Sequence, residues 1–177
     1  SATEVYAIRV LEAAGLNHEK DIKKERLGVA ESANAVKDKK IDAFFWVGGL
    51  PTAGVTDLAS TPNTKIKIID IAHLTDKMNA KYGKLYAPAV IPASTYKGMD
   101  KDAQNNSVWN IMAVNASMSD DMVYKLTKII IEKRADLALV HAEAQNIKPE
   151  WQTSSRAGIA WHPGALKYFK EVGIKVE

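Results

Sequence analysis

The residues best placed to do chemistry in this sequence form a glycine-containing turn at positions 46–52, which reads WVGGLPT. Gly48 and Gly49 carry no side chains, so another group can approach their backbone closely. Pro51 is typical of the first position of a helix, where its missing N–H costs nothing. The residue before it cannot cap a helix, so the N–H groups of Thr52 and its neighbours lack a side-chain acceptor.

These N–H groups would lie at the positive end of a helix dipole, which attracts an anion or another polar ligand. Trp46 directly precedes the turn and would form the floor of such a pocket. The alternative is an ordinary strand–helix turn in which water binds the N–H groups, because anion binding is one use of a very common turn. The spacing of residues alone leaves both interpretations open.

A strand and a helix must position this turn. Residues Ile41 to Val47 form an apolar run of strand length, which is typical of a strand covered on both faces. On such a strand Phe44 and Phe45 point to opposite faces, and we expect both to be buried. Ligands of parallel α/β sheets bind beyond the carboxyl ends of the strands, which is where this turn lies.

Other groups with chemical potential are less informative. No pair among the four histidines has the HExxH spacing of a metal site, and we expect surface or capping roles for His18, His73, His141 and His162. Asp120 and Asp121 suit the first turn of a helix better than a metal site. The stretch Ser154-Ser155-Arg156 could hold a carboxylate through the guanidinium, although a loop with a surface arginine explains it equally well. We expect neither a metal nor a cofactor.

Composition excludes several classes of function. The chain has 177 residues, of which 46% are hydrophobic and 25% charged, so it is an ordinary globular sequence. Its net charge of +3 is small and dispersed, which argues against a nucleic-acid partner. The absence of cysteine excludes disulfides and thiolate chemistry. No apolar run has membrane-spanning length, so we expect no direct insertion into a membrane.

Helical and strand patterns alternate along the chain. We expect helices at Ser1 to Gly15, Ala30 to Val36, Pro51 to Ala59, Leu74 to Gly83, Ser119 to Lys133, Leu137 to Ala144 and His162 to Gly173. We expect strands at Ile41 to Val47, Ile66 to Ile71 and Val108 to Val114. Prolines demote Leu85 to Ile91 to an edge or a connector, and Ala93 to Asn106 reads as a polar loop. This alternation predicts an α/β fold with a mostly parallel sheet and helices on both faces.

Several stretches taken in order resemble one family. They are SATE at 1–4, LEAAGL at 11–16, KIDAFFWVGGLP at 40–51, IPASTYKG at 91–98, VYKLTKIIIE at 123–132 and HPGALKYFKEVG at 162–173. Together they resemble the TAXI group of solute receptors for tripartite TRAP transporters. In that family the first stretch usually reads Gly-Ser-Gly-Thr-Glu. Here Ala2 replaces the second glycine, while the hydroxyls of Ser1 and Thr3 remain.

The resemblance implies a periplasmic-binding-protein fold of type II, in which two α/β lobes enclose a hinged cleft. Residues 1–92 would belong to the second lobe. Residues 93–177 would complete that lobe and return toward the first. Family members carry an export signal and a first lobe ahead of the first stretch, and neither is present here, so we expect the chain to be a fragment.

The resemblance also implies that two segments face the cleft and bind the ligand. The expected ligand-binding residues are Ser1, Ala2, Thr3, Glu4, Trp46, Gly48, Gly49, Pro51 and Thr52. The implied function is a periplasmic receptor, not an enzyme, that captures a small organic acid or a glutamate-like amino acid. It would deliver this solute to the membrane permease of a TRAP transporter.

Two rival functions remain open at this point. The first is an enzyme on the same fold that makes a cofactor precursor or transfers phosphoribosyl groups, since fold does not fix function. It would need acid–base or metal groups at the cleft, and turnover assays would reveal it. The second is a scaffold or antigen-like surface protein with a vestigial cleft, against which a ligand retained through purification would count.

Overall fold

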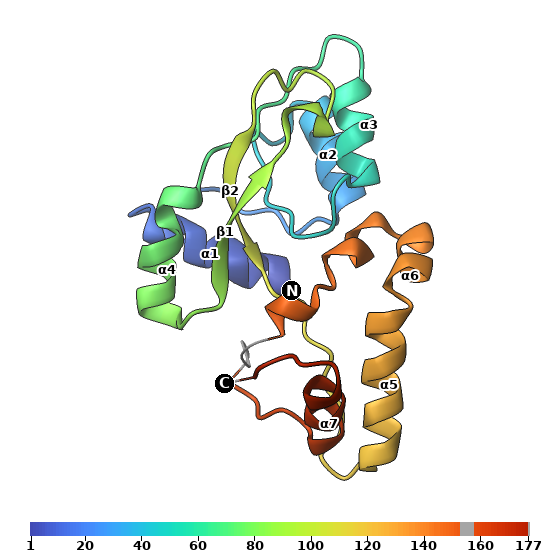
Figure 1. The fold of residues 1–177 in the computed structure, drawn as a ribbon. Helices are drawn as coiled ribbons and strands as arrows, with labels where there is room; N and C mark the ends of the chain where they lie inside the picture. The colour runs from blue at the N-terminus through green and yellow to red at the C-terminus, as the bar shows by residue number, and fades with distance from the viewer. Residues whose placement is uncertain (153–157, 177) are drawn as a thin grey trace. The chain divides into compact units, whose positions relative to one another are not determined.

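The computed structural model describes residues 1–152 and 158–176, and the chain divides into two compact units (Figure 1). Unit 1 comprises residues 1–108 and unit 2 comprises residues 109–177. The described residues form two hydrophobic clusters in unit 1 and one in unit 2.

Unit 1 combines four α-helices with a small sheet. In chain order its elements are α1 (Ala2–Ala13), α2 (Val29–Lys37), α3 (Ala53–Ser60), η1 (Ala72–Leu74), α4 (Thr75–Tyr82), β1 (Tyr86–Ile91), η2 (Ala93–Thr95) and β2 (Ala103–Val108). The two strands pair antiparallel, with Tyr86 opposite Val108 and Ile91 opposite Ala103. The ends of α1 and α4 follow the sequence prediction, because Gly15, after the C-cap of α1, and Gly83, the C-cap of α4, have positive φ angles of 83° and 85°.

The expected mostly parallel sheet is not seen in the described residues, whose sheet has two antiparallel strands. Residues 41–47 and 66–71, both predicted as strands, lie outside helices and strands. Residues 66–71 reach β2 through one backbone hydrogen bond of 2.8 Å, from the Ile71 N–H to the Gln104 carbonyl oxygen. An apolar run identifies a segment that can be buried, but a strand also needs partner strands on its flanks, and these are not supplied here.

The predicted burial of both phenylalanines is therefore wrong. Phe44 is half-buried against a core cluster, but Phe45 is 36% exposed. Val47 packs against the other cluster of unit 1. Alternate side chains of this segment thus reach different neighbours, but no second layer covers Phe45.

The strand β2 was predicted as part of a polar loop, and that prediction is wrong. Its sequence AQNNSV lacks the apolar alternation that marks a half-buried strand. It becomes a strand because β1 supplies the pairing partner. The prediction that β1 lies at an edge is confirmed, since both strands of a two-stranded sheet are edges and Pro88 is tolerated there.

The first core cluster fixes α1 onto the sheet and α4. It consists of Tyr6, Val10, Ala13, Leu74, Met78 and Tyr86. The Tyr6 hydroxyl donates a hydrogen bond to Asn106 Oδ1 on β2. Burial, and then the neighbouring Tyr86, raise the pKa of Tyr6 to about 12, so this hydroxyl is neutral at physiological pH.

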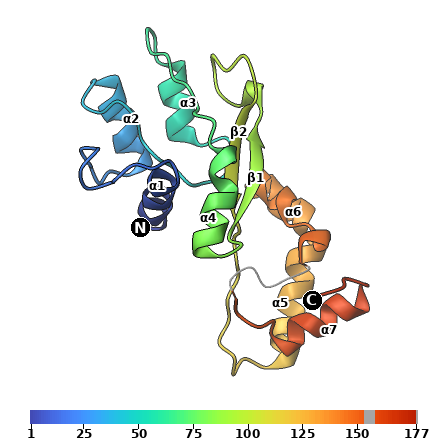
Figure 2. The same cartoon turned by 90° about the vertical axis from the view of Figure 1, so that its left-hand side faces the viewer.

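The second core cluster holds the start of α3. It contains Val55, Ala59 and Tyr96, with a rim of half-buried apolar residues. The helices α2 and α3 lie side by side (Figures 1 and 2). At Gly54 a Cβ atom would lie 3.4 Å from Val29 Cγ2, so the first turns of the two helices pack closely.

Unit 2 consists of helices and connecting segments. Its elements are α5 (Asp120–Glu132), α6 (Arg134–Val140), η3 (Ala142–Asn146), η4 (Pro149–Trp151) and α7 (Pro163–Glu171). The predicted cap of α5 is confirmed, because Ser119 Oγ accepts the Met122 N–H at 3.3 Å. His162 caps α7 by accepting the Gly164 N–H at 3.2 Å. The predicted strand at 108–114 is wrong beyond Val108, since residues 109–114 lie outside helices and strands.

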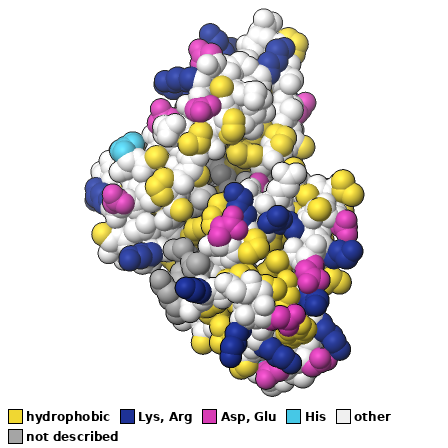
Figure 3. Space-filling model, in the orientation of Figure 1, with side chains coloured by type: hydrophobic (Ala, Val, Ile, Leu, Met, Phe, Trp, Pro, Cys, Tyr) yellow, Lys and Arg dark blue, Asp and Glu magenta, His cyan; other side chains and the backbone are white. Residues whose placement is uncertain are grey.

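The surface carries mixed charge. On the face in Figure 3, Lys and Arg side chains alternate with Asp and Glu rather than forming one basic area. This agrees with the small net charge of +3. In the part of the chain that the structure describes, no helix has both the length and the apolar character needed to cross a membrane.

Candidate ligand-binding site

The turn before α3 is closed by a small side-chain network. Trp46 Nε1–H donates a hydrogen bond of 2.9 Å to the hydroxyl oxygen of Thr52. The same hydroxyl donates to the Gly49 carbonyl oxygen, also at 2.9 Å. A Cβ atom on Gly48 would lie 2.6 Å from the Trp46 indole nitrogen, so only glycine lets the indole lie against the turn in this way. Four of the predicted site residues are thus brought together.

The prediction that Pro51 occupies the first helical position is wrong. The helix α3 begins at Ala53, and Thr52 is its N-cap residue. The peptide bond between Leu50 and Pro51 is cis. The Thr52 side chain makes no capping hydrogen bond to the helix, and its hydroxyl instead bonds the Trp46 indole and the Gly49 carbonyl oxygen.

The N–H groups at this helix start divide into two kinds. The Thr52 N–H was expected to lack an acceptor, but it donates to the Tyr96 hydroxyl oxygen at 3.0 Å, which corrects that expectation. Among the described residues, no group accepts the N–H of Ala53 or of Gly54. Two adjacent donors therefore remain available at the positive end of α3.

Tyr96 contacts this turn and was not among the residues predicted from the sequence. It lies 44 positions beyond Thr52, in the segment interpreted as a polar loop, and it is only 5% exposed. The available signal was an aromatic residue within that polar segment. Its contact with Thr52 could not be read from spacing, because only the fold brings the two residues together.

The other predicted segment, residues 1–4, begins α1. Ser1 and Glu4 form the predicted capping box, with the Glu4 N–H donating to Ser1 Oγ at 3.2 Å. The hydrogen bond from the Ser1 amino group, and then the Arg26 guanidinium 3.0 Å from Oε1, lower the pKa of Glu4. Ala2 is exposed and Thr3 is half-buried in the first turn of the helix.

Whether the two segments share one site stays a prediction. Both belong to unit 1, and Val47, directly before Gly48, packs on the cluster to which α1 contributes. No hydrogen bond or ion pair joins residues 1–4 to residues 46–52 in the described part of the chain. Each of the two segments is therefore held by its own local hydrogen bonds.

The remaining sequence candidates contribute little. The stretch Ser154-Ser155-Arg156 lies outside the described residues. In the described ranges no group of three His, Asp or Glu side chains is arranged to hold a metal ion. Asp120 and Asp121 lie in the first turn of α5, as predicted, and Asp120 Oδ1 is 3.8 Å from Nδ1 of His162, the capping residue of α7.

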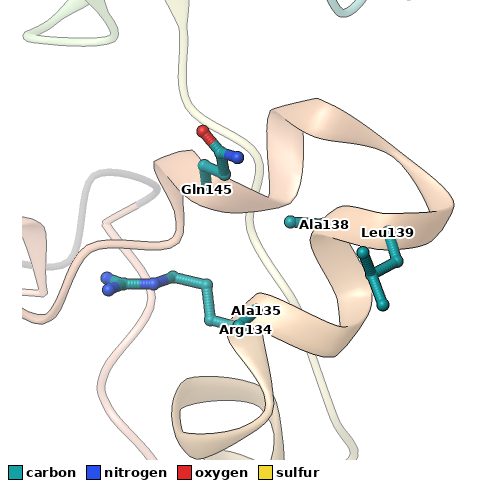
Figure 4. Close-up of a pocket in the computed structure, with 5 residues that line it drawn as sticks. All are labelled: Arg134, Ala135, Ala138, Leu139 and Gln145. Atoms are coloured by element: carbon teal, nitrogen blue, oxygen red, sulfur yellow. The ribbon is translucent and has the colours of Figure 1, made fainter.

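A surface hollow in unit 2 is not a convincing site. It is lined by Arg134, Ala135, Ala138, Leu139 and Gln145 (Figure 4). Arg134 extends to one side of α6, and its Nη1–H already donates to the Ile147 carbonyl oxygen at 3.2 Å. Leu139 is 88% exposed, so its side chain does not enclose a ligand beside Arg134 and Gln145.

The sequence matches a known protein family over most of its length. Residues 1–173, nearly the whole chain, match the family described as NMT1-like. The chain belongs to the NMT1-like family. This is a family of solute receptors related to periplasmic binding proteins.

Membership of the NMT1-like family implies binding of a small-molecule solute. The turn before α3 offers main-chain donors, an indole and a hydroxyl rather than an acid–base pair. Such groups can hold an oxygen-bearing solute, and the family is a binding-protein family. The mixed helices and strands of unit 1 are consistent with a receptor of this kind.

Proposed function

We propose that the protein is a TAXI-type receptor that captures a small carboxylate or amino acid, such as glutamate, in the periplasm. The closed receptor would deliver this solute to the membrane permease of a TRAP transporter. The observation that carries the proposal is the match of residues 1–173 to the NMT1-like family. The ordered stretches that resemble TAXI receptors support the narrower assignment.

In this proposal residues 1–92 belong to the second lobe of a two-lobe receptor. Residues 93–177 complete the lobe and lead back toward the other one. The ligand lies in the cleft, where the segments 1–4 and 46–52 converge on it. Hinged closure of two lobes then removes the solute from water, as in other binding proteins of this architecture.

The turn before α3 supplies the proposed carboxylate contacts. No described residue accepts the N–H groups of Ala53 and Gly54, and a helix N-terminus favours a negative charge. Each hydrogen bond to a charged group contributes about 1.5–3 kcal/mol when water is excluded. Trp46 is 41% exposed and would provide the apolar wall beside these donors.

The test uses the receptor expressed from its complete reading frame and purified without denaturation. Native mass spectrometry should detect a retained acid of low mass. Thermal melting should rise on addition of L-glutamate or of another small carboxylate, because a ligand that binds the folded state stabilises it. Absence of a retained ligand together with unchanged melting across a panel of acids would refute the proposal. Conversion of the bound acid into a product would favour the enzyme alternative.

A further inference from the structure

The hydroxyl of the buried residue Tyr96 reaches the start of α3. The residue is 5% exposed, and its ring packs in the cluster that contains Val55 and Ala59 of that helix. Its hydroxyl oxygen lies 3.0 Å from the Thr52 nitrogen, one residue before Ala53. Ala53 itself is exposed, so the hydroxyl lies at the boundary between the core and an accessible helix end.

Only half of the hydrogen-bonding capacity of this hydroxyl is used. A phenol oxygen can accept a hydrogen bond and can also donate its own proton. The Tyr96 oxygen accepts the Thr52 N–H. Within residues 1–152 and 158–176 no group accepts the Tyr96 proton. The hydroxyl therefore has one partner within the described residues, and its proton is left for a second acceptor at the accessible helix end.

We propose that Tyr96 is a ligand-binding residue of the site before α3, with two roles. Its oxygen fixes the Thr52 amide, and its proton is donated to the carboxylate oxygen of the captured acid. This inference rests on the proposed receptor function. The site then has three donors, the Ala53 and Gly54 N–H groups and the Tyr96 O–H. An ionised carboxylate, with two oxygens and about four acceptor positions, can accept all three.

Tyr96 lies in a segment that the sequence pattern did not assign to the site. Thr52 follows the strand-like run at 41–47, whereas Tyr96 lies in the connection between β1 and β2. A ligand bound to both would hold that connection against the start of α3. The two hydrogen bonds of Tyr96 therefore link ligand binding to the position of the connection between β1 and β2.

The test compares Tyr96→Phe with Tyr6→Phe in the receptor expressed from its complete reading frame. Both changes remove one hydroxyl from a buried tyrosine of unit 1, but the Tyr6 hydroxyl bonds Asn106, in the other cluster. Calorimetric titration with L-glutamate measures affinity, and thermal melting measures stability. Hydrogen exchange of the Thr52 amide, followed by NMR without ligand, measures the positioning contact directly.

We expect Tyr96→Phe to weaken L-glutamate binding by about 10- to 100-fold, because a donor to a charged group is lost. We expect Tyr6→Phe to lower the melting temperature without changing affinity. The Thr52 amide should exchange faster in Tyr96→Phe only. Faster exchange with unchanged affinity would overturn the inference, since the hydroxyl would then be structural. A wild-type receptor that binds no small acid would instead refute the proposed function, and the inference with it.

Discussion

A Cβ atom on Gly48 would lie 2.6 Å from the indole nitrogen of Trp46 and 3.0 Å from Cε2. Atoms at such distances cannot coexist, so the position of the indole requires glycine at this place. The indole in turn donates to Thr52, the N-cap residue of α3. The absence of one side chain therefore allows the whole turn to close.

We expect Gly48→Ala to displace the indole and destabilise unit 1 by about 1–3 kcal/mol, as overpacking does. Denaturant unfolding followed by circular dichroism measures this cost. Trp46→Ala removes the clashing ring, so Gly48→Ala should cost less in that background. A double-mutant cycle with strictly additive costs would contradict the contact.

Gly49→Val tests whether the turn binds a ligand. Gly49 is not among the glycines with positive φ, so valine imposes no left-handed strain there, and its methyl groups add bulk to the turn that precedes α3. We expect L-glutamate affinity to fall at least about tenfold while melting changes little. Calorimetric titration and thermal melting on the same variant separate the two effects. A lowered melting temperature with unchanged affinity would mean that the turn is only structural.

Phe44 and Phe45 should differ in their contribution to stability. Phe44 is half-buried in the second core cluster, and we expect Phe44→Ala to cost about 1–3 kcal/mol. Phe45 is 36% exposed, and its replacement by alanine should cost less than about 1 kcal/mol. Urea unfolding of the two variants gives the comparison directly. Equal costs would show that Phe45 is covered in solution.

Acid should weaken unit 1 through Glu12. The hydrogen bond from the Tyr82 hydroxyl, and then the hydrogen bond from Lys81, lower the pKa of Glu12 from its usual 4.5. Because the folded-state pKa is the lower one, this stabilisation is present above pH 4.5 and is lost as pH falls through the folded-state value. Glu12→Gln should therefore reduce the loss of stability between pH 6 and pH 3.

Urea midpoints across this range measure the effect of Glu12. Tyr82→Phe is the matched control, because it removes the principal hydrogen bond but keeps the carboxyl group. It should reduce the pH dependence in the same direction and by a smaller amount. Identical acid profiles for wild type and Glu12→Gln would show that the carboxyl group has the same pKa in the folded and unfolded chains.

Gly164→Ala should destabilise unit 2. A Cβ atom there would lie 2.3 Å from the Asp120 carbonyl oxygen and 2.9 Å from the Tyr124 nitrogen. Both are backbone atoms of the α5 region, so relief requires α7 to shift as a whole, at a cost of about 1–3 kcal/mol or more. Leu166→Ala, at a side chain that is 40% exposed on the same helix, is the control and should cost less. Thermal unfolding of both variants decides the matter.

The sequence alone determined several helix ends. Ser1, Ser119, Gly15 and Gly83 were assigned their capping or terminating roles correctly, because each depends on a side-chain oxygen or a φ angle within one helical turn. The turn at Gly48 was located for the same reason. Caps and turns of this kind depend on residues that are close together in the sequence.

The tertiary structure decided which segments pair and which donors remain free. The segment AQNNSV forms a strand because it pairs with β1. The more apolar run at 41–47 has no pairing strand among the described residues. The Thr52 N–H gained Tyr96 as an acceptor from 44 residues away, and Phe45 stayed uncovered. Strand pairing and burial depend on segments that are distant in the chain. Hydrophobic periodicity shows that one face of a strand or helix must be buried, but it does not show which segment covers that face.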